Sequence, residues 1–312
     1  MMEYIQLILL RNFYKCIIKF SVDNKSDNWM SDKPKYQKLN QIRNSHHDIA
    51  CNYALDTTTC VQAFWYECVN NNLSQENIKR AFDQLTEAKS IQSPYLMNIL
   101  DISQSYQPSK FIIVTEATDS PSLAAYIKQL VAPPPDKTII RWFKSLATAV
   151  QAIHASPLKI SHGQISLHNV YFRTSPSNIK LSLPISNLSL RYVTNQSIDI
   201  DPYTAPEKIK GVICQANDIW SLGICLLELL TGEPAYSEMK TPVQLVDALT
   251  NLQLPESLSK VRNQAAYKLI TRCLQGEAFR INIDDLLKDP LFNELNLNPT
   301  QLPGNSSQLL LL

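Results

Sequence analysis

Short apolar runs separated by polar turns characterise the first part of the chain. Residues 50–55 and 61–66 flank a polar turn, a pattern that predicts a β-hairpin. Residues 96–102 and 111–115 predict a second pair of strands. Between the two pairs, apolar positions three and four residues apart predict one helix over residues 74–91, with Ser74 as its cap. The pattern therefore favours a strand-rich unit with a single main helix.

Helical spacing dominates the rest of the chain. Residues 137–154 place apolar side chains on one face, which predicts an amphipathic helix. Residues 219–230 are apolar on nearly every side, as in a helix at the centre of a domain, and Gly232 suits its C-terminal end. Further helices are indicated at residues 242–252, 263–274 and 282–287, and a short strand pair at residues 170–172 and 179–181. The expected fold class is α+β, with a small β-rich N-lobe containing one main helix and a larger α-helical C-lobe.

Polar composition marks the expected domain boundaries. Residues 23–35 are polar and predict a linker, whereas the chain ends in a run of leucines. The apolar stretches near the N-terminus fall short of the roughly 20 residues that span a bilayer, so no stable membrane insertion is expected. The predicted organisation is an N-terminal extension and linker over 1–35, a folded domain over 36–295 with its N-lobe at about 36–117 and its C-lobe at about 118–295, and a flexible tail over 296–312.

Composition excludes several classes of partner and cofactor. Lys and Arg number 29 against 28 for Asp and Glu, a balance that gives no electrostatic case for nucleic acid. The seven cysteines include no CxxC pair, so neither a zinc knuckle nor a disulfide framework is indicated, and a cytoplasmic location is expected. His46 and His47 are adjacent and would point to opposite faces of a strand, so no metal site is predicted. Glycine is absent before Gly163, which excludes a glycine-rich phosphate loop from the first half of the chain.

Four motifs in the second half of the chain carry a family resemblance. Residues 161–170 (SHGQISLHNV) have the shape of a protein kinase catalytic loop, HRDLKxxN. Residues 205–207 read APE and residues 218–223 read DIWSLG. Arg280 lies at the distance at which kinases place the arginine that pairs with the APE glutamate. In this order and spacing, the motifs resemble those of the protein kinases, which implies a bilobal protein kinase-like domain over residues 36–295.

Within the kinases, the chain is similar to the With-No-Lysine (WNK) family and to its pseudokinase relative, the nuclear receptor-binding protein. Residues 54–57 (ALDT) and 61–67 (VQAFWYE) resemble the WNK segment GLDT…VEVAWCE. Residues 112–116 (IIVTE) resemble the WNK hinge between the lobes, and residues 236–238 (YSE) match a WNK tripeptide. The resemblance covers most of the chain and leaves both termini unexplained.

The resemblance implies roles for several retained residues. Asn169 matches a magnesium ligand of kinases and is the sole surviving position of that kind. His162 and Asp218 match residues that hold the catalytic loop, and Glu207 with Arg280 match a buried ion pair, so these four are expected to maintain the fold. The hinge residues that would line an adenine pocket are Thr115, Glu116 and Ala117.

The charged groups that perform phosphoryl transfer are missing from the matching positions. Tyr66 stands where kinases carry the phosphate-binding lysine of strand three, and Gln84 stands where the glutamate that pairs with this lysine lies. Gln164 replaces the catalytic aspartate, and an amide cannot act as a base near neutral pH. Ser166 replaces the loop lysine, and Leu183 replaces the aspartate that ligates magnesium. No catalytic residue is therefore expected.

The leading interpretation is a catalytically inactive kinase-like domain, or pseudokinase, that uses no cofactor and acts as a scaffold or adaptor for other signalling proteins. WNK kinases carry a substitute lysine on strand two, but the matching residue here is Ile49, and no Lys or Arg lies between Arg43 and Lys79. The alternative is a divergent Ser/Thr kinase of WNK type that binds ATP and Mg²⁺. A duplicate without a selected role also stays open.

Overall fold

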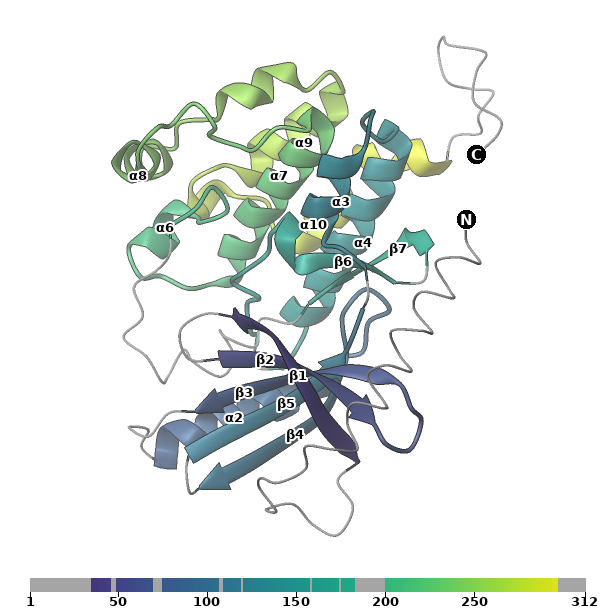
Figure 1. Ribbon diagram of the computed structural model, residues 1–312. Helices are drawn as coiled ribbons and strands as arrows, with labels where there is room; N and C mark the ends of the chain where they lie inside the picture. Colours follow the sequence, from purple (N-terminus) through teal and green to yellow (C-terminus); the bar gives the residue numbers. More distant parts are fainter. Residues whose placement is uncertain are drawn as a thin grey trace.

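Two lobes make up the computed structural model, a sheet-containing N-lobe and a helical C-lobe (Figure 1). The structure describes residues 35–45, 49–69, 75–106, 109–118, 120–157, 159–173, 175–182 and 200–296.

A five-stranded antiparallel sheet forms the N-lobe, in the order β1-β2-β3-β5-β4. Successive side chains of a strand point to opposite faces. Ala63 and Trp65 are therefore buried in the core on one face, while Phe64 and Tyr66 share the other. The strands are β1 (Tyr36–Ser45), β2 (Ile49–Asp56), β3 (Gln62–Val69), β4 (Ile99–Tyr106) and β5 (Ser109–Glu116), and helix α2 (Gln75–Ser90) packs against β4.

Helix α7 (Gln215–Thr231) lies at the centre of the C-lobe, where most of its side chains are buried. Helices α4 (Asp136–His154) and α9 (Gln264–Cys273) pack against it. Gly223 permits the close approach of α9, because a Cβ at this position would lie 2.6 Å from the Cβ of Cys273. The helix ends at Gly232, whose φ of +70° lies in the left-handed region that favours glycine.

The remaining elements surround this central helix. They are α3 (Leu123–Gln129), β6 (Val170–Arg173), β7 (Ser175–Leu181), α6 (Pro206–Ile209), α8 (Pro242–Thr250), α10 (Ile283–Leu287) and the 3₁₀ helices η1 (Leu167–Asn169), η2 (Glu256–Lys260), η3 (Glu277–Phe279) and η4 (Pro290–Asn296). Tyr126 of α3, Trp142 of α4 and Phe172 of β6 form an aromatic cluster with ring centroids 4.7–6.3 Å apart, which joins these three elements.

An ion pair joins the two lobes beside the hinge. Nζ of Lys180 in β7 lies 2.5 Å from Oε2 of Glu116 at the end of β5, and Lys180 is buried. The other oxygen of Glu116 accepts a hydrogen bond from Nδ2 of Asn98 at 3.0 Å. The backbone N–H of Met97 also donates to the carbonyl of Leu181 at 2.9 Å. Because a buried ammonium needs a counterion, Lys180 holds the hinge against the β6–β7 pair.

The predicted fold class is confirmed. The expected hairpin, main helix and second strand pair are present as β2–β3, α2 and β4–β5, and the amphipathic and central helices as α4 and α7. The hydrophobic pattern did not predict strand β1, whose residues are mostly polar. It also missed α6 and the 3₁₀ helices, because such short elements carry too little periodicity. Ser74, the expected helix cap, lies outside the described residues, and the domain boundaries stay predictions. No helix in the described part of the chain is long and apolar enough to cross a membrane.

Candidate functional site

The catalytic-loop segment is anchored to α7 by one buried carboxylate. Asp218 is 0% exposed, and its two oxygens accept the backbone N–H groups of His162 and Gly163, each at 2.7 Å. Nε2 of His154, at the end of α4, lies 2.7 Å from the same carboxylate. Three elements therefore meet at Asp218, which has the loop-holding position expected from the sequence.

His162 is a neutral, buried ring with a fixed tautomer. Its Nε2 lies 2.7 Å from the carbonyl oxygen of Ser182, which can only accept, so this nitrogen carries the proton. Its Nδ1 accepts the backbone N–H of Gln164 at 3.2 Å, so that nitrogen is unprotonated. Burial lowers the pKa of His162, in agreement with this neutral form. His162 thus connects the loop to the end of β7.

Lys208 braces the same loop, a role that the sequence analysis missed. Its Nζ donates to the carbonyl of Gly163 at 2.7 Å, and burial lowers the pKa of Lys208. Gly163 has a φ of +72°, a left-handed conformation that favours glycine. The only signal available in the sequence is that Lys208 directly follows the APE motif.

Tyr66 occupies the lysine position on the cleft face of β3. It pairs with Cys51 of β2 and Ile113 of β5 in the sheet register. Burial raises its pKa well above 10, and the side chains of Cys51 and Thr115 lie near enough to influence this pKa. Tyr171 of β6 lies close enough to raise this pKa further. A neutral phenol therefore stands at the position matched to the strand-three lysine of kinases.

Aromatic rings extend this neutral surface along the sheet. The ring of Phe64 lies 6.3 Å from that of Tyr66 and 5.7 Å from that of Tyr53 on β2. Neither Tyr53 nor Phe64 was among the site residues expected from the sequence. The alternation of side chains along β3 could have placed Phe64 beside Tyr66, because residues two apart in a strand share a face.

At the predicted hinge, the polar side chains of Thr115 and Glu116 bond to other groups of the protein. Thr115 is buried, and its hydroxyl donates to the carbonyl of Glu116 at 3.1 Å. Glu116 directs its carboxylate to Lys180 and Asn98, and Ala117 follows it half-buried. The three residues thus lie together at the junction of the lobes, and the adenine pocket stays a prediction.

The other predicted site residues are scattered between the loop and α2. Nδ2 of Asn169 donates to the carbonyl of Gln164 at 2.8 Å, so this side chain closes the loop on itself. The carbonyl of Ser166 accepts the backbone N–H of Asn169 at 3.0 Å. Gln84 is half-buried on α2, and Leu183 lies outside the described residues.

The described residues do not fit a magnesium–nucleotide complex. Mg²⁺ binds through carboxylates and phosphate oxygens in octahedral geometry. Asn169 bonds to the loop through its amide nitrogen and keeps only Oδ1 as a ligand, and Leu183, matched to the carboxylate ligand, has no oxygen in its side chain. Within the described ranges, no group of three or more His, Cys, Asp or Glu side chains could hold a metal ion. No chemical step is therefore derived through this ion.

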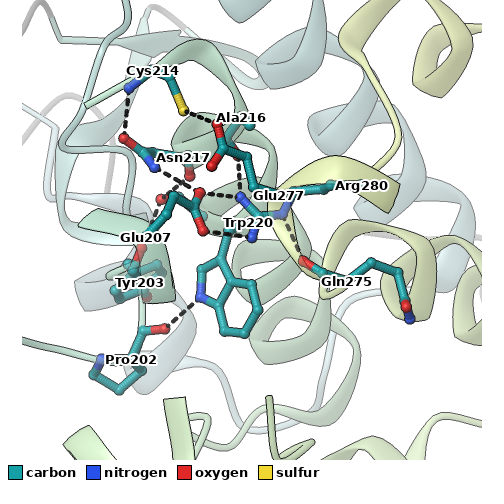
Figure 2. Close-up of polar contacts among 11 residues, drawn as sticks. Pro202, Tyr203, Glu207, Cys214, Ala216, Asn217, Trp220, Gln275, Glu277 and Arg280 are labelled. Carbon is teal, nitrogen blue, oxygen red and sulfur yellow. Dashed lines mark hydrogen bonds and ion pairs between the residues drawn. The ribbon is translucent and has the colours of Figure 1, made fainter. Parts of the chain in front are cut away.

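Glu207 and Arg280 form the buried ion pair expected from the motif spacing (Figure 2). Both Nη atoms of Arg280 bond to the carboxylate of Glu207, one of them at 3.0 Å. Asn217 donates to the same carboxylate at 2.7 Å. The pKa of Glu207 stays below its usual value: burial opposes ionisation, but the bonds from Arg280 outweigh it.

Arg280 also connects three further parts of the C-lobe (Figure 2). It donates to the carbonyl of Ala216 at 2.8 Å and to that of Gln275 at 3.0 Å. Its guanidinium lies 5.3 Å from the ring centroid of Trp220, within cation–π range. The indole N–H of Trp220 in turn donates to the carbonyl of Pro202 at 3.3 Å. Arg280 is therefore a central contact between the APE segment, α7 and the loop after α9.

Comparison with known proteins identifies the family of this fold. Residues 62–292 match the family model described as protein kinase domain. The chain therefore belongs to the protein kinase domain family.

The relatives place the fold within the WNK type. Mouse serine/threonine-protein kinase WNK3 is 26% identical over 244 residues, which cover 77% of this chain and 14% of that protein. Human serine/threonine-protein kinase WNK4 is 25% identical over 244 residues, 77% of this chain and 20% of that protein. Serine/threonine-protein kinase pkpA of Phycomyces blakesleeanus is 25% identical over 260 residues, 83% of this chain and 42% of that protein. The chain has a WNK-like protein kinase fold and spans less than half the length of each of these relatives.

Replacing Arg280 by Leu should severely destabilise the C-lobe. The change leaves the Glu207 carboxylate buried without its cation, which costs about 3–5 kcal/mol. Urea denaturation should show this loss in the free energy of unfolding. Arg262 is exposed and forms no ion pair in the described structure, so Arg262→Leu should change stability by less than about 0.5 kcal/mol. Equal losses in the two variants would contradict the role given to Arg280.

Lowering the pH from 7 to 5 should destabilise the fold through His162. Burial lowers the pKa of His162 below its usual 6.5, so just below pH 6.5 the unfolded chain binds a proton that the folded chain excludes. The stability conferred by the neutral ring is present above pH 6.5 and is lost as the pH falls towards the folded-state pKa. The free energy of unfolding should fall by at most about 1.4 kcal/mol per pH unit through this group. Thermal unfolding measured across this range detects the loss.

Two glutamine substitutions isolate this effect. His162→Gln keeps an N–H donor but does not titrate, so its stability should depend less on pH. His168 is exposed, and His168→Gln should keep the full dependence. Burial raises the pKa of Glu228, which acts in the opposite direction in all three proteins. If His162→Gln loses as much stability as the unsubstituted chain, another group is responsible.

Proposed function

We propose that the chain is a pseudokinase, a catalytically inactive protein kinase-like domain that acts as a scaffold or adaptor in intracellular signalling. The observation that carries the proposal is Tyr66. Its half-buried side chain is a phenol, neutral at pH 7, whose pKa is raised well above 10 by burial, and it lies opposite Cys51 and Ile113 in the sheet. Phosphoryl transfer depends on cations that neutralise the charge of the transferred phosphate. With Ile49 at the position of the WNK substitute lysine, neither strand supplies this cation.

Two positions on the catalytic loop support the same proposal. Gln164 has no carboxylate to accept a proton, and loss of a general base costs about 10²–10⁴ in rate. Ser166 supplies no cation where kinases use a lysine. Both losses act on the same transfer step as the loss at Tyr66. Although such effects are not simply additive, they all reduce transfer.

The intact framework supports the adaptor part of the proposal. Asp218 still anchors the loop, and Glu207 and Arg280 still tie the C-lobe together. Such a domain presents a stable surface to other proteins without needing chemistry in its cleft. The signalling context is carried over from relatives that are named serine/threonine-protein kinases.

A divergent Ser/Thr kinase of WNK type that binds ATP and Mg²⁺ is the second candidate. The retained Asn169 and the braced loop favour it, together with about 25% identity to named kinases. It needs a substitute cation near the loop. Lys208 is a described residue with this property, because its Nζ contacts the carbonyl of Gly163.

The purified chain should transfer no phosphate from ATP to a generic Ser/Thr peptide above a heat-denatured control. Gln164→Asp should not restore transfer, because a base alone leaves Tyr66 and Ser166 without charge. Incorporation of labelled γ-phosphate is the measurement. Mg²⁺ with millimolar ATP should also leave the melting temperature unchanged.

The contrary results favour the second candidate. A nucleotide at 100 times its dissociation constant would add about 2.7 kcal/mol of stability, a rise of several degrees. Such a rise, or robust transfer by Gln164→Asp, would show that a cation outside the matched positions serves the phosphate. Lys208→Met would then remove that activity if Lys208 is the substitute.

Partner capture should be independent of the cleft. The tagged chain should retain the same proteins from cell extract with and without Mg²⁺ and ATP, and so should Gln164→Ala. Arg280→Leu, which is expected to be severely destabilised, is heat-denatured before use and serves as the control for specific capture. If folded Gln164→Ala loses its partners, the cleft takes part in binding and this part of the proposal fails.

A further inference from the structure

A cavity of about 250 Å³ lies in the C-lobe, between the end of α4, the start of α7 and the segment that runs from Arg280 into α10. Ala216 and Arg280, both labelled in Figure 2, belong to its wall. Ile219 provides an apolar surface, whereas Gln151, Gln215 and Asp284 provide polar groups. No residue matched to a catalytic position lines this cavity.

Two side-chain amides of the cavity each use one N–H group within the protein. Nε2 of Gln151 donates to Oδ1 of Asp284 at 2.7 Å, and Nε2 of Gln215 donates to the carbonyl of His154 at 3.0 Å. Each amide keeps its carbonyl oxygen as an acceptor, and its second N–H, for a guest. Nε2 of His154 is engaged with Asp218. The cavity thus presents two amide oxygens beside the carboxylate of Asp284.

The charge of the cavity is also unbalanced. Arg280, the cation in the wall, is neutralised by both oxygens of Glu207. Asp284 receives the amide of Gln151 but forms no ion pair among the described residues. A negative charge therefore remains at the rim, next to acceptors on α4 and α7.

We propose that this cavity binds an arginine side chain of a partner protein, an assignment that rests on the adaptor function proposed above. A guanidinium carries five N–H donors and no acceptor, which complements a site that offers acceptors and one carboxylate. Its planar fork matches a carboxylate in two-point contact. The methylene stem of the arginine packs against Ile219, so charge and apolar surface are both used.

Titration of the full chain with acetyl-arginine methylamide tests this proposal, with the citrulline analogue as an uncharged control of the same shape. Backbone amide NMR signals of residues 151–155, 215–219 and 280–284 should shift in a saturable manner with arginine and not with citrulline. Asp284→Asn should weaken binding about fivefold, the size of an exposed carboxylate–cation contact. Asp247→Asn, the same change at an exposed position on α8, should bind normally.

Equal binding of citrulline, normal binding by Asp284→Asn, or absence of saturable shifts would overturn the assignment. Melting temperatures of both variants establish that they are folded. In the capture experiment, Asp284→Asn should lose proteins that Asp247→Asn retains, and retention of all of them would exclude a partner as the source of the arginine. The arginine titration contains neither nucleotide nor substrate. A negative result there would therefore not bear on the phosphate-transfer assay, which tests the proposed function separately.

Discussion

The carboxylate of Asp218 is a buried charge that the fold must satisfy. It lies in a helix whose other side chains are mostly apolar, and it accepts N–H groups from His162, Gly163 and His154 at 2.7 Å. An unpaired charge in such a place would cost several kcal/mol. The catalytic loop, α4 and α7 therefore have to assemble around it together. Asp218 sets the rotation of α7 relative to the loop, which apolar packing alone leaves less determined.

Around Tyr66, in contrast, the side chains that lie close together are neutral and include no buried charge. Tyr66 reaches Cys51 and Thr115, and burial raises the pKa of the Cys51 thiol to about 11. Phe64 and Tyr53 continue this surface with ring contacts. Buried polar groups that bond to each other need no counterion, whereas buried cations do. The N-lobe therefore needs no phosphate to neutralise a buried cation at this position.

The sequence predicted features that repeat or follow a motif order. Periodicity located α2, α4 and α7, and motif spacing paired Glu207 with Arg280 across 73 positions. Lys180 and Lys208 could not be found in this way, because a lysine in a polar segment looks the same whether it is exposed or buried. Their partners, Glu116 and the carbonyl of Gly163, are brought to them only by the folded chain.

The same limit applies to the cavity, whose Gln151 and Asp284 are 133 positions apart. His154 links this cavity to the catalytic loop, since its ring bonds to Asp218. A ligand that binds only the folded chain stabilises it. In this cavity, one wall residue, His154, is hydrogen-bonded to Asp218, so binding and folding are coupled. Substitutions at His154 or Arg280 would therefore mix binding with folding. Asp284 is exposed at the rim and outside the buried network, which allows recognition to be separated from stability.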